Sequence, residues 1–283
     1  MQNQILIFSD ITPYFSIVIP IHNQDKIIVE VLRRILMYTE EMPYELICIL
    51  DACSDNTDAV VTSFFSSNRI PELLTKVTIV VSKIPLFETA CDNIGARLAK
   101  GKFFLEIQAD IIIDEPGYNM KLLRPFTIVP NVIGVSGRCT HGLINPVCVG
   151  KIGNTIEVQL PHDVDFTKFY VGETCNRGPL LIELAKLEEL HYFDEENFFL
   201  DDSDHDLFAR AYVQKQWICG YVPIEIMSNL EDGSTRKERD ALNQEYYTRM
   251  MNRPTTGGFL KTYMERMQDK DAREIYVIDL YRP

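Results

Sequence analysis

The feature that most constrains the fold is a regular alternation of apolar runs and amphipathic segments over the first 110 residues. The runs are FSIVIPI (15–21), ELICIL (45–50), VTIVV (77–81) and FFLEI (103–107). Runs of this length and composition are typical of strands buried on both faces. The segments between them carry apolar residues at helical spacing, as at Ile28, Val31, Leu32 and Ile35. The alternation predicts right-handed βαβ units and a parallel sheet flanked by helices.

The second half of the chain is less regular. Residues 133–175 are predicted to form strands and loops, and apolar spacing predicts a helix over 179–190. A second helix is predicted over 204–212, and WICGYV (217–222) is typical of a further strand. Beyond about residue 230 the sequence becomes polar and charged, which favours a separate extension of the domain.

Composition excludes some classes of protein. Lys and Arg total 28 against 41 Asp and Glu, a net charge of -13, so nucleic acid is not an expected partner. The seven Cys are odd in number and form no CxxC pair, which argues against a zinc knuckle or a disulfide framework. We find no signal peptide and no apolar run of the roughly 20 residues that a transmembrane helix needs. The sequence therefore predicts a soluble, cytoplasmic protein.

Polar residues at the ends of the predicted strands indicate a ligand site. In open α/β sheets, ligands bind beyond the carboxyl ends of the strands. Asn23, Asp51 and Asp110 lie at three such ends, and an acidic segment (194–206) precedes the helix predicted at 204. Mg²⁺ and Mn²⁺ prefer oxygen ligands and neutralise diphosphate charge, while a separate carboxylate can accept a proton from a hydroxyl. The pattern predicts a metal-assisted site for a diphosphate.

Each motif also has a structural interpretation. Asp55 and Thr57 are suited to capping a helix, and Asp51 is a common type of turn residue. The acidic segment is equally consistent with a solvated loop. His205, between two aspartates, fits a structural or solvent-facing role as well as a metal ligand.

Four ordered blocks together are more specific than any single motif. They are SIVIPIHN, ILDACSDNT, ACDNIGARLAKGKFFLEIQADI and NRGPLLIELAKLEELHYFDEENFFLDDSDHDLFARAY. Over residues 14–228 this series resembles the family-2 glycosyltransferases. The resemblance implies a GT-A-type fold with a Rossmann-like, mostly parallel sheet, a nucleotide-diphosphosugar donor and inversion at the anomeric carbon. The expected organisation is a GT-A domain over 1–230, with a nucleotide-binding half (14–114) and an acceptor half (115–228). A helical extension (231–283) follows.

The resemblance also implies roles for individual residues. The expected donor-binding residues are Pro20, Asn23, Asp51, Asp55, Asn93, Gln108, Ala109 and Arg210, with Asp51 at the nucleobase. Asp110 corresponds to the last Asp of the metal-binding DxD motif. His205 is the second candidate metal ligand, on the ground of its position between two aspartates and not of the resemblance. Asp204 corresponds to the general base. Arg210 has two expected roles, contact with the diphosphate or orientation of a carboxylate.

Two departures from the family pattern affect these expectations. Gln108 occupies the first DxD position, and an amide is a poorer metal ligand than a carboxylate. Ser203 occupies the place of the Glu that usually precedes the base. Asp202 and Asp206 are therefore alternatives to Asp204 for sharing or taking over the base role.

The sequence thus predicts an enzyme that moves a hexose-like sugar from a UDP- or GDP-sugar to a hydroxyl. The acceptor is expected to be a carbohydrate, lipid or protein, and the cofactor Mn²⁺ or Mg²⁺. A sugar nucleotidyltransferase is an alternative, although the first loop, IPIHNQDK, lacks the glycines that such enzymes use. A non-catalytic binding module with the same fold is a third alternative, favoured by Gln108.

Overall fold

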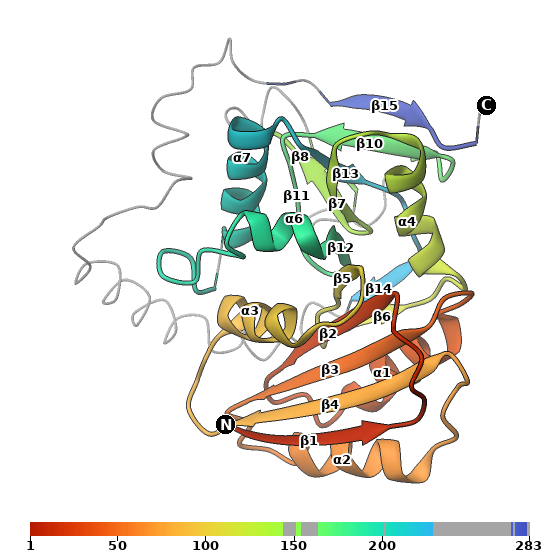
Figure 1. Cartoon of the computed structure of the whole chain (residues 1–283), viewed down its shortest axis with the longest axis vertical. Helices are drawn as coiled ribbons and strands as arrows, with labels where there is room; N and C mark the ends of the chain where they lie inside the picture. The colour runs from red at the N-terminus through yellow and green to blue at the C-terminus, as the bar shows by residue number, and fades with distance from the viewer. Residues whose placement is uncertain (144–150, 154–163, 201, 229–272, 274, 282–283) are drawn as a thin grey trace.

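A ten-stranded sheet forms the centre of the molecule. The computed structural model describes residues 1–143, 151–153, 164–200, 202–228, 273 and 275–281 (Figure 1). In spatial order the strands of the sheet are β1 (Gln2–Ile7), β4 (Leu74–Ser82), β3 (Tyr44–Asp51), β2 (Phe15–Ile21), β5 (Phe103–Glu106), β12 (Leu180–Glu183), β7 (Val132–Ser136), β13 (Ile218–Tyr221), β10 (Lys168–Gly172) and β15 (Tyr276–Asp279).

The amino-terminal half of the sheet has the predicted βαβ organisation. Strand β2 pairs in parallel with β3 and β5, and β3 pairs in parallel with β4. The connecting helices are α1 (Ile28–Tyr38), α2 (Thr57–Ser67) and α3 (Glu88–Leu98). All four predicted apolar runs are strands here. The carboxyl ends of β2, β3 and β5 therefore lie along one edge, where a ligand site is expected.

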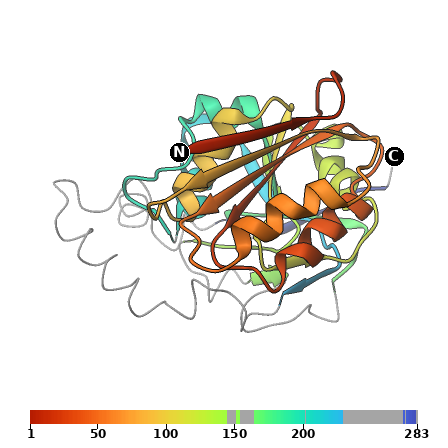
Figure 2. The ribbon, with the colours of Figure 1, turned by 90° about the horizontal axis from the view of Figure 1, so that it is seen from below.

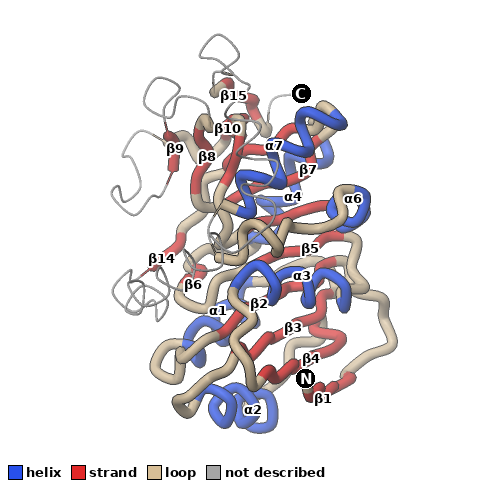
Figure 3. The backbone as a smooth tube through the Cα atoms, turned by 90° about the vertical axis from the view of Figure 1, so that its left-hand side faces the viewer, coloured by secondary structure: helices blue, strands red, loops and turns tan. Residues whose placement is uncertain are grey.

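Helices cover both faces of the sheet, in three layers. Alternate residues of β2 face opposite ways: Ile17 and Ile19 join one core with α1, α2 and α4 (Tyr118–Ile128), and Val18 joins a second core. The second core contains α3, α6 (Leu184–Glu189) and α7 (Ser203–Lys215). Figures 2 and 3 show α1 and α2 on the opposite side of the sheet from α3. Residues of α3 and α7 therefore project into the same layer.

Helix α3 lies very close to β2. A Cβ atom at Gly95 would lie 2.2 Å from Cγ1 of Val18, closer than any van der Waals contact permits. Only glycine leaves room for this approach. The close packing fixes the helix that carries Glu88, Asp92 and Asn93 against the sheet.

One element differs from its prediction. Residues Leu180–Glu183, assigned by pattern to a helix over 179–190, form β12, which pairs antiparallel with both β5 and β7. Only Leu184–Glu189 is helical. The reason is that a short, continuous apolar run fits a buried strand and a buried helix equally well. The helix predicted over 204–212 and the strand predicted over 217–222 are confirmed as α7 and β13.

Other strands lie at the edges or outside the main sheet. Strand β1, which the sequence pattern did not predict, pairs antiparallel with β4 along its whole length. Two small sheets contain β11 (Thr174–Cys175), β8 (Cys139–His141) and β9 (Lys151–Gly153), and β14 (Ile226–Ser228) with β6 (Ile111–Ile113). Within the predicted extension (231–283), β15 pairs with β10, and most of the rest lies outside the described residues.

Two further observations concern the described residues only. None of their helices has the length and apolar character required to span a bilayer. The six cysteines among them, at positions 48, 53, 91, 139, 175 and 219, are free thiols, in line with the predicted lack of a disulfide framework.

Candidate active site

The loops after β2 and β3 are joined by side-chain hydrogen bonds. Asn23 has a left-handed backbone, and its Oδ1 accepts a 2.8 Å hydrogen bond from the backbone N–H of Ser54. Asp55 accepts from the N–H of Asp25 and, at 2.9 Å, from that of Thr57. Pro20 is half-buried at the end of β2. The residues predicted for the first nucleotide-binding loop therefore form one continuous loop surface.

Asp51 ends β3 and organises the loop before α3. Its Oδ1 accepts from Leu86 N–H at 2.7 Å and its Oδ2 from Phe87 N–H at 2.9 Å. Phe87 has a positive φ of 67° and packs edge-on against Phe199, with ring centroids 4.8 Å apart. Each carboxylate oxygen keeps lone pairs for a further donor. Asp51 therefore shapes the loop, and its carboxylate can still accept a hydrogen bond from a bound ligand.

At the end of β5, Gln108 lies between a carboxylate and a guanidinium. Its Nε2 donates to Glu88 Oε1 at 2.6 Å, and its Oε1 accepts from Arg138 Nη1 at 3.1 Å. Ala109 is buried, and Asp110 is half-buried in the turn that leads to β6. The QAD motif therefore lies at the expected edge of the sheet, with its amide held on both sides.

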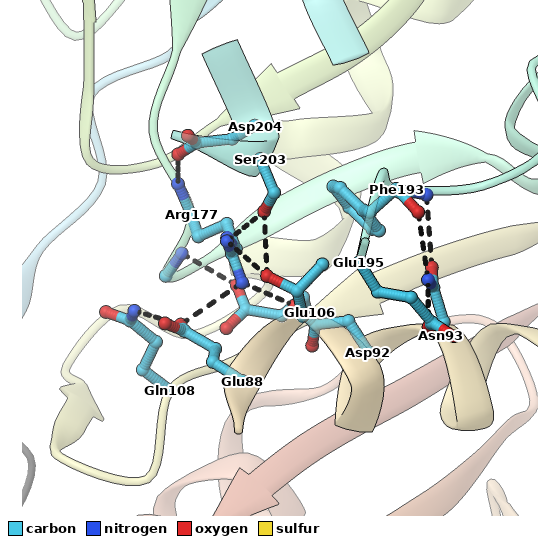
Figure 4. A network of polar contacts seen from close by, with 12 residues as sticks. Glu88, Asp92, Asn93, Glu106, Gln108, Arg177, Phe193, Glu195, Ser203 and Asp204 are labelled. Carbon is cyan, nitrogen blue, oxygen red and sulfur yellow. Dashed lines mark hydrogen bonds and ion pairs between the residues drawn. The ribbon is translucent and has the colours of Figure 1, made fainter. Parts of the chain in front are cut away.

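Arg177 is the centre of a buried polar network (Figure 4). Only 4% of this residue is exposed, and its Nη1 donates to Asp92 Oδ2 at 2.8 Å and lies 3.6 Å from Glu88 Oε1. Its Nη2 donates to Ser203 Oγ, at the start of α7. The backbone N–H of Arg177 donates to Asp204 Oδ2 at 3.2 Å. One residue thus joins α3, α7 and the loop before β12.

The network contains more buried carboxyl groups than buried cationic groups. Asp92 and Glu106 are both fully buried, and Glu106 Oε2 accepts from Gly178 N–H at 2.8 Å. One oxygen of each, Asp92 Oδ1 and Glu106 Oε1, has no hydrogen-bond partner among the described residues. Burial raises the pKa of Asp92 to about 8 against the opposing charge of Arg177, and burial also raises the pKa of Glu106. The site therefore favours a proton on these acids at neutral pH.

This raised pKa gives a testable pH dependence. The pKa of Asp92 rises from 3.8 to about 8 in the folded protein. Its protonated form therefore stabilises the fold fully below the unfolded pKa, and this contribution is lost as pH rises to the folded value. Asp92→Asn mimics the protonated acid. The free energy of unfolding of the wild type, relative to the variant, should fall by up to about 1.4 kcal/mol per pH unit across this range.

Urea denaturation of both proteins at several pH values between about 5 and 8 measures the difference. Asp10→Asn, at an exposed position, is the control and should show no such trend. A difference between wild type and Asp92→Asn that stays constant across this range would contradict the assignment.

Asp204 lies at the start of α7 and is 6% exposed. Its Oδ1 accepts from His205 N–H at 2.8 Å, and its Oδ2 accepts from Arg177 N–H. Burial opposes ionisation, but the charges of His205 and Arg177 and the two backbone hydrogen bonds outweigh it, so the pKa of Asp204 lies below its usual range. The carboxylate is therefore ionised at neutral pH and positioned by two backbone donors.

The other two acidic candidates have different surroundings. Asp206 is fully buried, and its Oδ2 accepts from Arg210 Nε at 2.6 Å. Arg210 also donates to the carbonyls of Leu190 and Tyr192, so it orients a carboxylate and holds the segment after α6. Asp202 is exposed, with a left-handed backbone. Of the three, Asp204 is the one in contact with the Arg177 network.

Asn93 links α3 to the segment before α7. Its Oδ1 accepts from Phe193 N–H at 3.0 Å, and its Nδ2 donates to Phe193 O at 2.9 Å. The Nδ2 also donates to Glu195 Oε2 at 2.6 Å. Asn93 is fully buried, so in this structure its contacts are with the protein backbone and Glu195.

The site fits a divalent cation at position 110 and fits it poorly at position 108. Asp110 offers a carboxylate, whereas the amide oxygen of Gln108 already faces the Arg138 guanidinium. His205 Nδ1 lies 2.8 Å from Thr174 Oγ1. Within the described ranges no group of three His, Cys, Asp or Glu side chains is arranged to hold a metal ion. A cation bound at Asp110 would therefore take most of its ligands from phosphate oxygens and water.

Comparisons with known proteins identify the amino-terminal part of the chain. Residues 16–136 match the family model described as "Glycosyl transferase family 2". This segment belongs to glycosyl transferase family 2. It contains the loops after β2, β3 and β5, including Asn23, Asp51 and Asp110. The match ends at Ser136, so Arg177 and Asp204 lie beyond the family-2 segment.

Solved structures establish the fold. The Staphylococcus aureus protein TarS (residues 1–349, solved with UDP) is 14% identical with a TM-score of 0.53, and the alignment covers 88% of this chain and 69% of that one. The mannosyltransferase PcManGT from Pyrobaculum calidifontis, solved with GDP-Man and Mn²⁺, is 15% identical with a TM-score of 0.58, covering 92% and 70%. No curated protein sequence matches the chain. The expected GT-A-type fold is confirmed.

Sequence reasoning missed several residues of the site. Glu88, Asp92 and Glu106 were not predicted, and neither was Arg138. Glu106 carried a usable signal, because it is the one charged residue in an otherwise apolar strand, FFLEI. A buried carboxylate of this kind needs a cation partner, but the pattern does not say that the partner is Arg177, 71 positions further on.

Proposed function

We propose that the protein is an inverting glycosyltransferase that moves a sugar from a nucleotide-diphosphosugar to an acceptor hydroxyl. One observation carries the proposal: a continuous series of contacts joins the candidate base to the QAD motif. It runs from Asp204 through Arg177 and Glu88 to Gln108. A reacting hydroxyl at Asp204 and a diphosphate at the end of β5 would therefore lie on two sides of one rigid network.

The proposed reaction is a single displacement at the anomeric carbon. The acceptor oxygen forms a bond to this carbon as the bond to the diphosphate oxygen breaks, and the hydroxyl proton passes to the Asp204 carboxylate. The leaving group is a nucleoside diphosphate. Asp204 suits this role because its lowered pKa keeps it ionised and two backbone N–H groups fix its orientation.

The donor is expected to contact the loops of the family-2 segment. Asp51 has remaining acceptor capacity for a nucleobase N–H, and Asn23 and Asp55 shape the adjacent loop. The similar structures were solved with UDP and with GDP-Man and Mn²⁺, which supports a UDP- or GDP-sugar. A Mn²⁺ or Mg²⁺ ion would be held by Asp110, with His205 as the second predicted ligand, and would stabilise the charge of the leaving diphosphate.

Release of nucleoside diphosphate tests the proposal. The full chain is incubated with UDP- and GDP-sugars, Mn²⁺, and hydroxyl acceptors from three classes: saccharides, lipid alcohols and Ser/Thr peptides. Acceptor-dependent release of UDP or GDP, with a new glycoside of inverted configuration, is the expected result. Donor binding without release across all three acceptor classes would instead favour a non-catalytic GT-A module.

A further inference from the structure

Arg138 is a half-buried cation whose contact among the described side chains is with an amide and not with an acid. It follows β7, and its backbone N–H donates to Ser136 Oγ at 2.9 Å, which fixes the start of the loop. Its guanidinium has one side-chain contact, from Nη1 to Gln108 Oε1. In the part of the chain that the structure describes, no carboxylate forms an ion pair with it. The chain as a whole has 41 Asp and Glu against 28 Lys and Arg, a net charge of -13.

The residue at position 108 explains why the neighbour of this guanidinium is an amide and not a carboxylate. Gln108 donates its Nε2 to Glu88, so its amide oxygen is turned towards Arg138. A carboxylate at this position would form an ion pair with the arginine, whereas the neutral amide accepts one hydrogen bond from it and contributes no opposing charge. A guanidinium has five N–H donors, so four remain available.

The Arg138 guanidinium lies next to the QAD motif, because it donates a hydrogen bond to Gln108. Under the proposed function, the donor diphosphate lies at this edge of the sheet, next to positions 108 and 110. Glu88, which accepts the hydrogen bond from the Gln108 Nε2, also forms an ion pair with Arg177, with 3.6 Å between Glu88 Oε1 and Arg177 Nη1. Glu88 therefore already has Arg177 as its cationic partner, and the Arg138 guanidinium can accept an added anion.

We propose that the Arg138 guanidinium binds the diphosphate of the donor, and that nucleoside diphosphates consequently bind without a divalent cation. The planar fork of arginine forms two parallel hydrogen bonds with phosphate oxygens, and these charge-assisted bonds are among the strong ones. Arg138 thus supplies positive charge next to position 108, where the amide of Gln108 is a poor ligand for a metal ion. This inference rests on the proposed function and specifies how its donor site binds phosphate.

Calorimetric titration of the full chain with UDP and with GDP, in EDTA and in Mn²⁺, tests the inference. We expect one of the two nucleotides to bind the wild type in EDTA. Arg138→Gln should raise its Kd in EDTA by about 10- to 100-fold, the loss expected for hydrogen bonds to charged groups. Arg138→Lys, which keeps the charge without the fork, should give an intermediate Kd. Arg69→Gln, at an exposed arginine beyond α2, is the matched control and should leave Kd unchanged.

A second variant keeps the test independent of the stability of Arg138→Gln. Gln108→Asp places a carboxylate against the guanidinium and restores the first DxD position. It should weaken nucleotide binding in EDTA and make it depend on Mn²⁺. Wild-type binding that requires Mn²⁺, or equal Kd values for wild type and Arg138→Gln in EDTA, would overturn the inference and leave the proposed function standing. Absence of binding by any nucleotide or nucleotide sugar, with or without Mn²⁺, would instead contradict the proposed function.

Discussion

Replacement of Asp204 by asparagine should lower the rate of sugar transfer by about 10²- to 10⁴-fold, the usual contribution of a general base. The amide keeps the shape of the carboxylate and can still accept the hydrogen bonds from Arg177 and His205 through its oxygen. It cannot accept a proton from the acceptor hydroxyl. Because Asp204 lies at α7 and not in the loops of the family-2 segment, the Kd for the donor should change little.

The measurement is kcat for transfer together with the donor Kd by titration. Asp202→Asn is the matched control, since this neighbouring acid is exposed and, in the described structure, forms no side-chain hydrogen bond with the Arg177 network. Its kcat should stay close to the wild-type value. Transfer by Asp204→Asn at the wild-type rate would contradict the assignment, and a large loss in Asp202→Asn would move the base to that residue.

Replacement of Arg177 by methionine should destabilise the protein by about 3–5 kcal/mol, the loss typical of removing one partner from a buried ion pair. The two acids beside it, Asp92 and Glu106, are fully buried. Carboxylates raise the pKa of Arg177 further above its ordinary value, Glu88 and Asp92 foremost, despite the opposing effect of burial. Without the guanidinium, Asp92 Oδ2 and Ser203 Oγ lose a buried hydrogen-bond partner, the ionised Asp204 loses a stabilising charge, and α3 and α7 lose their common partner.

Chemical denaturation measures this loss, and a triple variant separates its causes. Arg177→Met combined with Asp92→Asn and Glu106→Gln replaces the two acids by neutral amides and should recover part of the stability at pH values above about 8, where Asp92 would otherwise ionise. Arg33→Met, at an exposed ion pair with Glu30, should cost no more than about 1 kcal/mol. An Arg177→Met protein as stable as the wild type would contradict the central position of this network.

The first half of the fold could be predicted because its strands are buried on both faces. The runs at 15–21, 45–50, 77–81 and 103–107 have no polar alternation and are separated by helical periodicity, so few other arrangements bury them. The prediction for the segment from Leu180 was wrong for a complementary reason. A short apolar run fits a strand or a helix equally well, and pairing with β5 and β7 makes this segment a strand. Local pattern contains no information about those partners.

The site could be predicted only in part, because its buried charges pair over long distances in sequence. Asp206 and Arg210 lie four residues apart on a helix and form an ion pair, in agreement with one of the two roles that the resemblance implied for Arg210. Arg177 and Asp92 are 85 positions apart, and Arg138 and Gln108 are 30 apart. Such contacts depend on how β12 and α7 return to the sheet, which the sequence pattern does not determine.

The central claim, a donor site for a nucleotide-diphosphosugar, is tested most directly by calorimetric titration of the full chain with UDP- and GDP-sugars in the presence of Mn²⁺. We predict saturable binding at one site for one of the two nucleotide classes, with competition by the corresponding nucleoside diphosphate. Absence of binding by both classes of sugar nucleotide would contradict the account and leave a GT-A fold without its donor.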